Sequence, residues 1–173
     1  MTPRQESHRM HLPAHQYLDD RAVPYHKRSF PSTTPKGAAS VAHALGYTAG
    51  QMVKTLIFQV DTGEKVLVML PGDKNAISGH LKKALGSRNI RLADPETVKA
   101  TTGYDIGSIP PFHWQPPGFR VFIEAALMHE DILGVGAGVW GQEIMLTPIH
   151  LVQAAQAVVV NLTNPILPVI AEE

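Results

Sequence analysis

Along this chain of 173 residues, apolar residues recur in some segments with the spacing of a helix and in others with the spacing of a strand. The most regular run is Met52–Val60, in which β-branched and aromatic side chains dominate. Such a composition is typical of a strand that packs on at least one face. The turn Asp61-Thr62-Gly63 and a second apolar run, Lys65–Leu70, follow it directly. The pattern therefore predicts a hairpin near the centre of the fold.

Helical and strand-like patterns alternate through the rest of the chain. They predict helices at 13–21, 36–45, 75–85, 94–102 and 147–156, a short helix or turn at 124–128, and strands at 23–30, 90–93, 120–123, 132–135, 143–146 and 158–162. Helices interleave with hairpins rather than following each strand singly. The fold class expected is α+β, a single domain with a mixed, curved and partly barrel-like sheet flanked by helices. Residues 1–12 are expected to be a flexible leader, 13–163 the domain and 164–173 a tail.

Composition excludes several classes of chemistry. The chain has no cysteine, which rules out disulfides, thiolate metal sites and cysteine nucleophiles. His8, His11 and His15 are spaced so that two imidazoles could share a helical face, but no carboxylate ligand is patterned with them. We therefore expect no metal and no other cofactor. No apolar run is long enough to span a bilayer, and the polar N-terminus is not signal-like, so a cytoplasmic protein without a membrane partner is expected.

Charge is distributed unevenly along the chain. Residues 1–100 hold 14 Lys+Arg and 8 Asp+Glu, a net 14 − 8 = +6, and residues 101–173 hold 1 and 7, a net 1 − 7 = −6. This asymmetry suggests a basic face that could meet a polyanion. Mutual attraction of the two parts across a solvated surface explains it equally well. Because the whole chain is neutral, any binding of nucleic acid should be weak and sensitive to salt.

Lys54 and one stiff loop are the candidates for chemistry. Lys54 lies in the strand Met52–Val60, where its ammonium either reaches solvent or points into a cleft opposite an anion or an oriented dipole. In the loop 103–112, Gly107 permits unusual backbone angles, and Pro110 and Pro111 fix their own. The amides of Gly107, Ser108 and Ile109 could be presented to a ligand oxygen. A rigid connection without a ligand is the alternative.

Five segments in one consistent order resemble the YbaK/prolyl-tRNA-synthetase-associated family of aminoacyl-tRNA deacylases. They are Val53-Lys54-Thr55-Leu56-Ile57-Phe58, Arg91-Leu92-Ala93-Asp94-Pro95-Glu96, Thr102-Gly103-Tyr104, Gly107-Ser108-Ile109-Pro110-Pro111 and Gly136-Ala137-Gly138. The similarity extends from about residue 13 to residue 162. Ser108 stands where many relatives carry a second glycine, and His113 stands where glycine is frequent. These departures bear on the shape of the amino-acid pocket.

The resemblance implies a function and assigns residues to it. It implies trans editing, the hydrolysis of tRNA mischarged with a small amino acid, with mischarged tRNA as partner, an aminoacyl-tRNA synthetase as a second candidate partner, and no DNA. Lys54 matches the functional lysine of the family. The substrate-binding positions implied are Gly107, Ser108, Ile109, Pro110, Pro111, Gly136, Ala137 and Gly138. Two alternatives stay open: a non-catalytic module that binds tRNA or a synthetase, and a hydrolase of small acylated metabolites.

Overall fold

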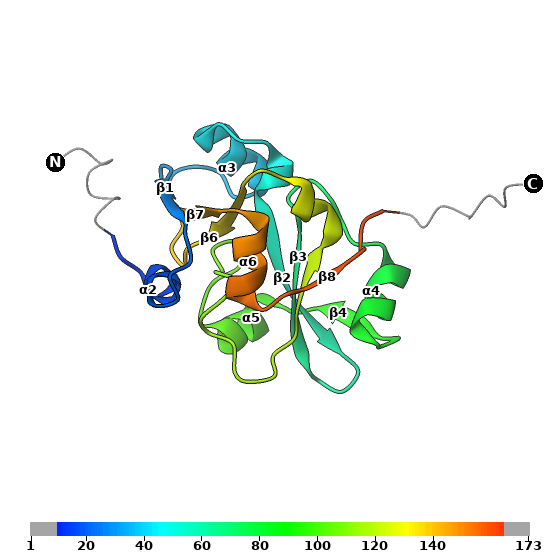
Figure 1. Ribbon diagram of the computed structural model, residues 1–173. Coiled ribbons are helices and arrows are strands. Elements are labelled where there is room, and N and C mark those ends of the chain that lie inside the picture. The colour runs from blue at the N-terminus through cyan, green and yellow to red at the C-terminus, as the bar shows by residue number, and fades with distance from the viewer. Residues whose placement is uncertain (1–9, 165–173) are drawn as a thin grey trace, which may run out of the picture.

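A computed structural model describes residues 10–164, which form a central sheet, a smaller sheet and surrounding helices (Figure 1). The helices are α2 (Pro13–Asp20), α3 (Ala38–Leu45), α4 (Ser78–Leu85), α5 (Pro95–Thr102) and α6 (Pro148–Ala155), with short 3-10 helices η1 (Ala49–Gln51) and η2 (Ala125–His129). The strands are β1 (His26–Ser29), β2 (Val53–Val60), β3 (Lys65–Pro71), β4 (Ile90–Leu92), β5 (Val121–Glu124), β6 (Leu133–Gly136), β7 (Gln142–Leu146) and β8 (Val158–Val160).

The strands form two sheets. The larger has the order β4-β2-β3-β5-β8 and is mixed, because β4, β2 and β3 pair antiparallel whereas β3, β5 and β8 pair parallel. The smaller, with the order β1-β7-β6, is antiparallel. A single bridge between Met52 and Gly134 links the start of β2 to β6. The predicted α+β class and mixed sheet are confirmed, but the strands divide between two sheets that do not close into a barrel.

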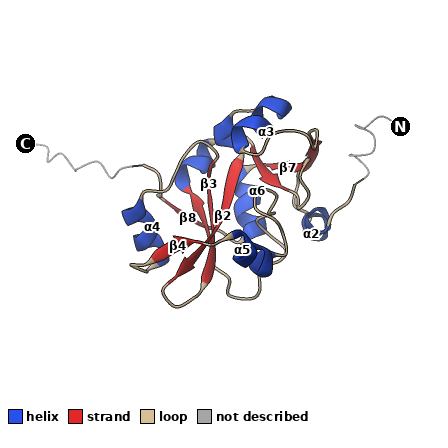
Figure 2. Cartoon of the chain, turned by 180° about the vertical axis from the view of Figure 1, so that it is seen from behind, coloured by secondary structure: helices blue, strands red, loops and turns tan. Residues whose placement is uncertain are grey.

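Alternate residues of β3 pack into two separate parts of the core. Leu67 and Met69 face α5, α6 and the smaller sheet, whereas Val66, Val68 and Leu70 face α4. All five side chains are almost completely buried, and each contributes about 1.5–3 kcal/mol relative to exposure. Figure 1 shows α6 lying across the larger sheet and α4 beside β4. Figure 2, the reverse view, shows α2 and the smaller sheet at the opposite end.

A third part of the core lies beneath α3. Val41 and Ala42 of α3 pack there against Phe30, Met52 and Met145. This cluster joins the smaller sheet to the start of β2, the strand that carries Lys54. It therefore fixes how the two sheets meet.

Predicted element boundaries differ from those observed at a few places. The strand predicted at 23–30 begins only at His26, because Ala22 has a positive φ of 52° and the Val23 N–H donates to the Leu18 carbonyl. The helix predicted at 75–85 begins at Ser78, because the Ile77 N–H is taken by the Leu162 carbonyl. The 3-10 helix η1 was not predicted. Most of the expected leader and tail, residues 1–9 and 165–173, lies outside the described residues.

The described part of the chain shows neither a metal cluster nor a membrane span. Between residues 10 and 164, no group of three or more His, Asp or Glu side chains is placed to hold a metal ion. His15 is buried, and its Nδ1 accepts a hydrogen bond from the Leu12 N–H at 3.0 Å. Within the same range, no helix has the length and apolar character needed to cross a bilayer.

Candidate functional site

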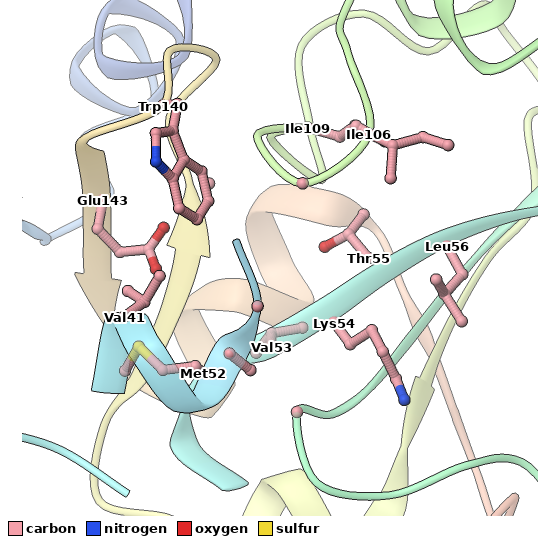
Figure 3. A pocket seen from close by; sticks show the side chains of 15 residues that line it. Val41, Met52, Val53, Lys54, Thr55, Leu56, Ile106, Ile109, Trp140 and Glu143 are labelled. Atoms are coloured by element: carbon pink, nitrogen blue, oxygen red, sulfur yellow. The ribbon is translucent and has the colours of Figure 1, made fainter. Parts of the chain in front are cut away.

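A cavity of about 350 Å³ lies where β2, the loop before Ile109 and the smaller sheet meet (Figure 3). Its walls come from segments far apart in the sequence. The lining residues are Gly37, Ala38, Val41, Met52, Val53, Lys54, Thr55, Leu56, Gly72, Ile106, Gly107, Ile109, Gly136, Trp140 and Glu143. Of the predicted site residues, Lys54, Gly107, Ile109 and Gly136 line the cavity.

One wall of the cavity is an unpaired stretch of β2. Strand β4 pairs only with Phe58–Val60, so no described strand pairs with β2 on that side at the level of Val53–Leu56. On the same side, the Ile57 carbonyl accepts a hydrogen bond from the Ala93 N–H at 2.9 Å. Alternate residues of a strand direct their backbone groups to the same side, so Thr55 presents its N–H and C=O to this open edge. The backbone of β2 can thus hydrogen-bond a ligand.

The Lys54 ammonium is held at the rim of the cavity by two oxygen atoms. Its Nζ donates to the Lys74 carbonyl at 2.6 Å and to Asn75 Oδ1 at 3.0 Å. Partial burial lowers the pKa of Lys54, an effect that the nearby Asp73 carboxylate opposes. In Figure 3 the Lys54 nitrogen lies on the side away from Glu143. The arrangement leaves a fixed positive charge beside the cavity.

The loop predicted to bind substrate contributes only part of its backbone to the cavity. Gly107 has a φ of +96°, which a residue with a side chain adopts only under strain. The Ser108 N–H turns away and donates to the Asp105 carbonyl at 3.3 Å. No backbone hydrogen bond within the described residues uses the N–H of Gly107 or of Ile109. These two amides therefore have no backbone partner, whereas the Ser108 amide already has one, and its contact with substrate stays a prediction.

The remaining predicted residues support the loop without lining the cavity. The carbonyls of Pro110 and Pro111 accept hydrogen bonds from Trp114 Nε1 at 2.6 Å and Gln115 Nε2 at 2.7 Å. The Tyr104 ring lies so close to Gly138 that a Cβ there would approach it to 2.6 Å. The Tyr104 hydroxyl in turn lies 2.5 Å from His113 Nε2.

Ala137 is fully buried, and its N–H donates to the Gln142 carbonyl at 3.3 Å. This bond closes the turn that follows β6. The pair Ala137-Gly138 and the two prolines thus contact the loop and its neighbours and are not among the lining residues; their contacts with substrate stay a prediction.

Gly136 is needed because the loop backbone packs directly against it. A Cβ at this position would lie 2.8 Å from the Ser108 carbonyl carbon and 3.2 Å from the Ile109 carbonyl oxygen. Gly136 also lies opposite Glu143 in the pairing of β6 and β7. The glycine thus sets both the position of the loop and the open space beside the Glu143 side chain.

The sequence model of the aminoacyl-tRNA editing domain family matches residues 34–154. The chain belongs to this family. A relative from Enterococcus faecalis, EbsC, a candidate Cys-tRNA(Pro)/Cys-tRNA(Cys) deacylase by name, is 30% identical over 132 residues, covering 76% of this chain and 80% of that protein. The match to a proline–tRNA ligase of Nitratidesulfovibrio vulgaris is 42% identical over 67 residues, which are 39% of this chain and only 12% of the ligase.

The fold agrees with that of a solved relative. The crystal structure of a candidate trans-editing enzyme for prolyl tRNA synthetase superposes with a TM-score of 0.80 at 25% sequence identity, covering 90% of this chain and 99% of that one. The resemblance seen in the sequence is therefore confirmed at the level of the family and of the fold.

Three residues of this editing domain that the sequence did not identify also line the cavity: Thr55, Trp140 and Glu143. The Glu143 carboxyl is buried and has no hydrogen-bond or ion-pair partner among the described residues, and burial raises its pKa to about 8. Thr55 Oγ1 is a fully buried atom that has no hydrogen-bond partner among the described residues. A lone acid inside an apolar strand, Gln142–Leu146, was the available signal for Glu143. The others carried no signal, because Thr55 reads as an ordinary strand residue and Trp140 as part of a glycine-rich loop.

Two further hollows continue from the cavity of this editing domain and define what we call the β2–α4 groove. The first, of about 290 Å³, shares Leu56 with the cavity and is lined mainly by apolar side chains, among them Phe58 and Leu92. The second, of about 460 Å³, shares Ser78, Lys82 and Ile90 with the first and adds Arg88 and Arg91, with Asp61 as its single acid. The groove leads from Lys54 to a cluster of cations.

Proposed function

We propose that this chain hydrolyses the ester of tRNA mischarged with a small amino acid, acting in trans on charged tRNA. Membership of the editing-domain family and the extensive match to the EbsC relative support deacylation. The observation that carries the proposal is the convergence of Lys54, the Gly107–Ile109 loop and Gly136 on one cavity. Because charged tRNA is the substrate, the proposal places the protein in the cytoplasm.

Lys54 is proposed as the residue that holds the charged terminus and stabilises the transition state. Water attacks the carbonyl carbon of the ester, and the carbonyl oxygen becomes an oxyanion. The bond between that carbon and the ribose oxygen then breaks, which releases the amino acid. The Lys54 ammonium and the free amides of Gly107 and Ile109 supply positive charge and donors for these oxygens. Such preorganised donors are worth about 3–4 kcal/mol each in other enzymes.

No described side chain is assigned as general base. His113 lies outside the cavity lining, its Nε2 is engaged by the Tyr104 hydroxyl, and burial lowers its pKa. A hydroxyl of the terminal ribose is the proposed activator of the attacking water. An aminoacyl ester is already an activated bond, so positioning and electrostatic stabilisation suffice for useful acceleration.

A small amino acid fits the walls of the cavity. Apolar side chains dominate the lining, including Val53, Ile109 and Trp140. Such walls separate substrates by only about 1–3 kcal/mol for each methylene group. We therefore expect a few small amino acids to be accepted rather than one.

The β2–α4 groove is the proposed path of the tRNA acceptor end. Lys82, Arg88 and Arg91 are exposed and have no ion-pair partner among residues 10–164. Phosphates of a single strand can contact these cations while bases lie on Phe58 and Leu92. With so few cations and a neutral chain, tRNA binding should be weak and sensitive to salt. An aminoacyl-tRNA synthetase remains a second proposed partner.

A panel of tRNAs charged with alanine, cysteine, serine, threonine or proline tests the proposal at low salt. Hydrolysis of one or a few members is expected. Saturable binding of charged tRNA without hydrolysis would favour a non-catalytic module. Loss of both binding and hydrolysis would favour a hydrolase of small acylated metabolites, for which tRNA should not compete.

A further inference from the structure

Glu143 is a buried acid whose position no structural role explains. It is 8% exposed, projects from β7 into the cavity and has neither a hydrogen-bond nor an ion-pair partner within residues 10–164 (Figure 3). A buried polar group without a partner costs a domain several kcal/mol when it is charged. A side chain that lowers the stability of the fold and faces a cavity is typical of a group that binds a ligand.

Among residues 10–164, Glu143 is the only acidic side chain in the cavity lining. Three cations lie on segments that surround it. Arg28 lies opposite it across β1 and β7, Lys36 lies over the Trp140 ring at 3.8 Å, and Lys54 lies on β2. None of these three forms an ion pair with Glu143 in the described part of the chain. The cavity therefore has a positive rim at Lys54 and a single acidic site at Glu143.

An aminoacyl ester has a matching distribution of charge. Its α-ammonium is the one cation common to every amino acid, and the phosphates of the terminal nucleotides are anions. Lys54 attracts the phosphates and repels the ammonium, whereas Glu143 does the reverse. Electrostatics thus orients the substrate with the acyl group toward β7 and the nucleotide toward the β2–α4 groove.

We propose that Glu143 is the counter-ion that binds the α-ammonium of the aminoacyl group, a role that rests on the proposed function. The ammonium supplies the partner that the buried carboxyl lacks, and binding converts an unpaired acid into an ion pair. The pairing holds the ester carbonyl between Lys54 and the Ile109 amide. It also discriminates by chemistry, because an acylated α-amine, as in peptidyl-tRNA, has no positive charge to pair with Glu143.

Stable analogues test this inference without requiring turnover. The ligands are 3′-alanylamino-3′-deoxyadenosine, whose amide replaces the ester, and the same compound acetylated on its α-amine. Isothermal titration of the wild-type chain at low salt should show the free amine binding at least about 10-fold more tightly, as expected for a partly buried ion pair. At pH 7 its binding should release a proton from Glu143, which buffers of different ionisation enthalpy would reveal.

Glu143→Gln keeps the size of the side chain and removes its charge. The variant should bind both analogues equally and release no proton, with folding checked by thermal unfolding. Asp131→Asn, which makes the same change from carboxylate to amide on an exposed side chain outside the cavity lining, is the matched control and should keep the preference for the free amine. Equal binding of both analogues to the wild-type chain, binding of neither, or a preference that survives in Glu143→Gln would overturn the inference. Binding with the expected preference but no deacylation of any charged tRNA would contradict the proposed function alone.

Discussion

Glu143 lies directly opposite Gly136 in the pairing of β7 with β6, so that an acid and the residue without a side chain face one cavity. The backbone of Ser108 and Ile109 occupies the space that a side chain at Gly136 would take. Within this pair, Glu143 supplies the acidic group of the cavity and Gly136 leaves room for the loop that contains Ser108 and Ile109.

Gly136→Ala should displace the loop. Its Cβ would lie 2.8 Å from the Ser108 carbonyl carbon, and backbone atoms cannot move aside as a flexible side chain does. We expect a loss of about 1–3 kcal/mol in unfolding free energy and a clear fall in deacylation.

Gly79→Ala is the control for this substitution, because Gly79 lies in α4 with an ordinary φ, and a Cβ added there would meet no atom within 4 Å. It should raise stability by about 0.5–1 kcal/mol and leave deacylation unchanged. Urea unfolding and single-turnover deacylation of both variants provide the comparison. Equal activity of the two variants would show that the loop does not depend on Gly136.

The titration of Glu143 should make the unfolding free energy of the chain depend on pH. Burial raises the pKa of this carboxyl from 4.5 to about 8. Between pH 4.5 and pH 8, therefore, the carboxyl is protonated in the folded state and ionised in the unfolded state. Stability contributed by this group is therefore present below pH 5, falls as pH rises toward 8, and levels off above it. The slope expected is about 1.4 kcal/mol per pH unit.

Glu143→Gln isolates this effect from the histidines. The difference in unfolding free energy between the wild-type chain and the variant, measured from pH 5 to pH 9, should change in favour of the variant as pH rises. His15, whose pKa is lowered to about 4 mainly by burial, titrates equally in both chains and cancels. A difference that does not vary with pH would show that Glu143 titrates near its ordinary value.

The contact between Tyr104 and His113 should stabilise the loop from behind. Their 2.5 Å hydrogen bond joins two residues on either side of the segment 105–112, and His113 has a φ of +78°. Tyr104→Phe removes the hydroxyl but keeps the ring against Gly138. We expect a loss of about 1 kcal/mol in unfolding free energy and a smaller loss of activity than in Gly136→Ala. Unchanged stability would contradict a bracing role.

The fold and part of the site were predictable because their signals are local. Asp94 accepts the Thr97 N–H at 2.8 Å as the expected helix cap, and Gly46 and Gly86 end their helices in the left-handed conformation. Lys54 and the Gly107 loop were identified through one family motif each. Glu143 was not identified, because its importance depends on the register of β7 with β6 and on contact with β2, which lies far away in the sequence. The hydrogen bond that directs the Ser108 N–H to the Asp105 carbonyl, away from the cavity, is likewise a feature of the folded loop.

Cations of the β2–α4 groove should control the affinity for tRNA rather than the chemical step. Lys82→Gln and Arg88→Gln each remove one positive charge from the second hollow. Each should weaken tRNA binding and reduce the slope of log affinity against log salt by about 0.7–0.9.

Arg21→Gln is the matched control for the groove variants, because Arg21 lies at the end of α2, at the opposite end of the molecule (Figure 2). It should leave both the affinity and the slope unchanged. Filter binding of uncharged tRNA at several salt concentrations measures these quantities. Identical slopes for all three variants would place the tRNA elsewhere.

The role of Lys54 is tested most directly by single-turnover deacylation of whichever charged tRNA the panel identifies. Lys54→Ala is compared with Lys65→Ala, which removes a lysine of the neighbouring strand that does not line the cavity. We predict that Lys54→Ala lowers the rate at least about 100-fold, or about 2.7 kcal/mol, while its thermal unfolding stays close to that of the wild-type chain. Lys65→Ala should retain the full rate. A folded Lys54→Ala variant with wild-type activity would contradict the account.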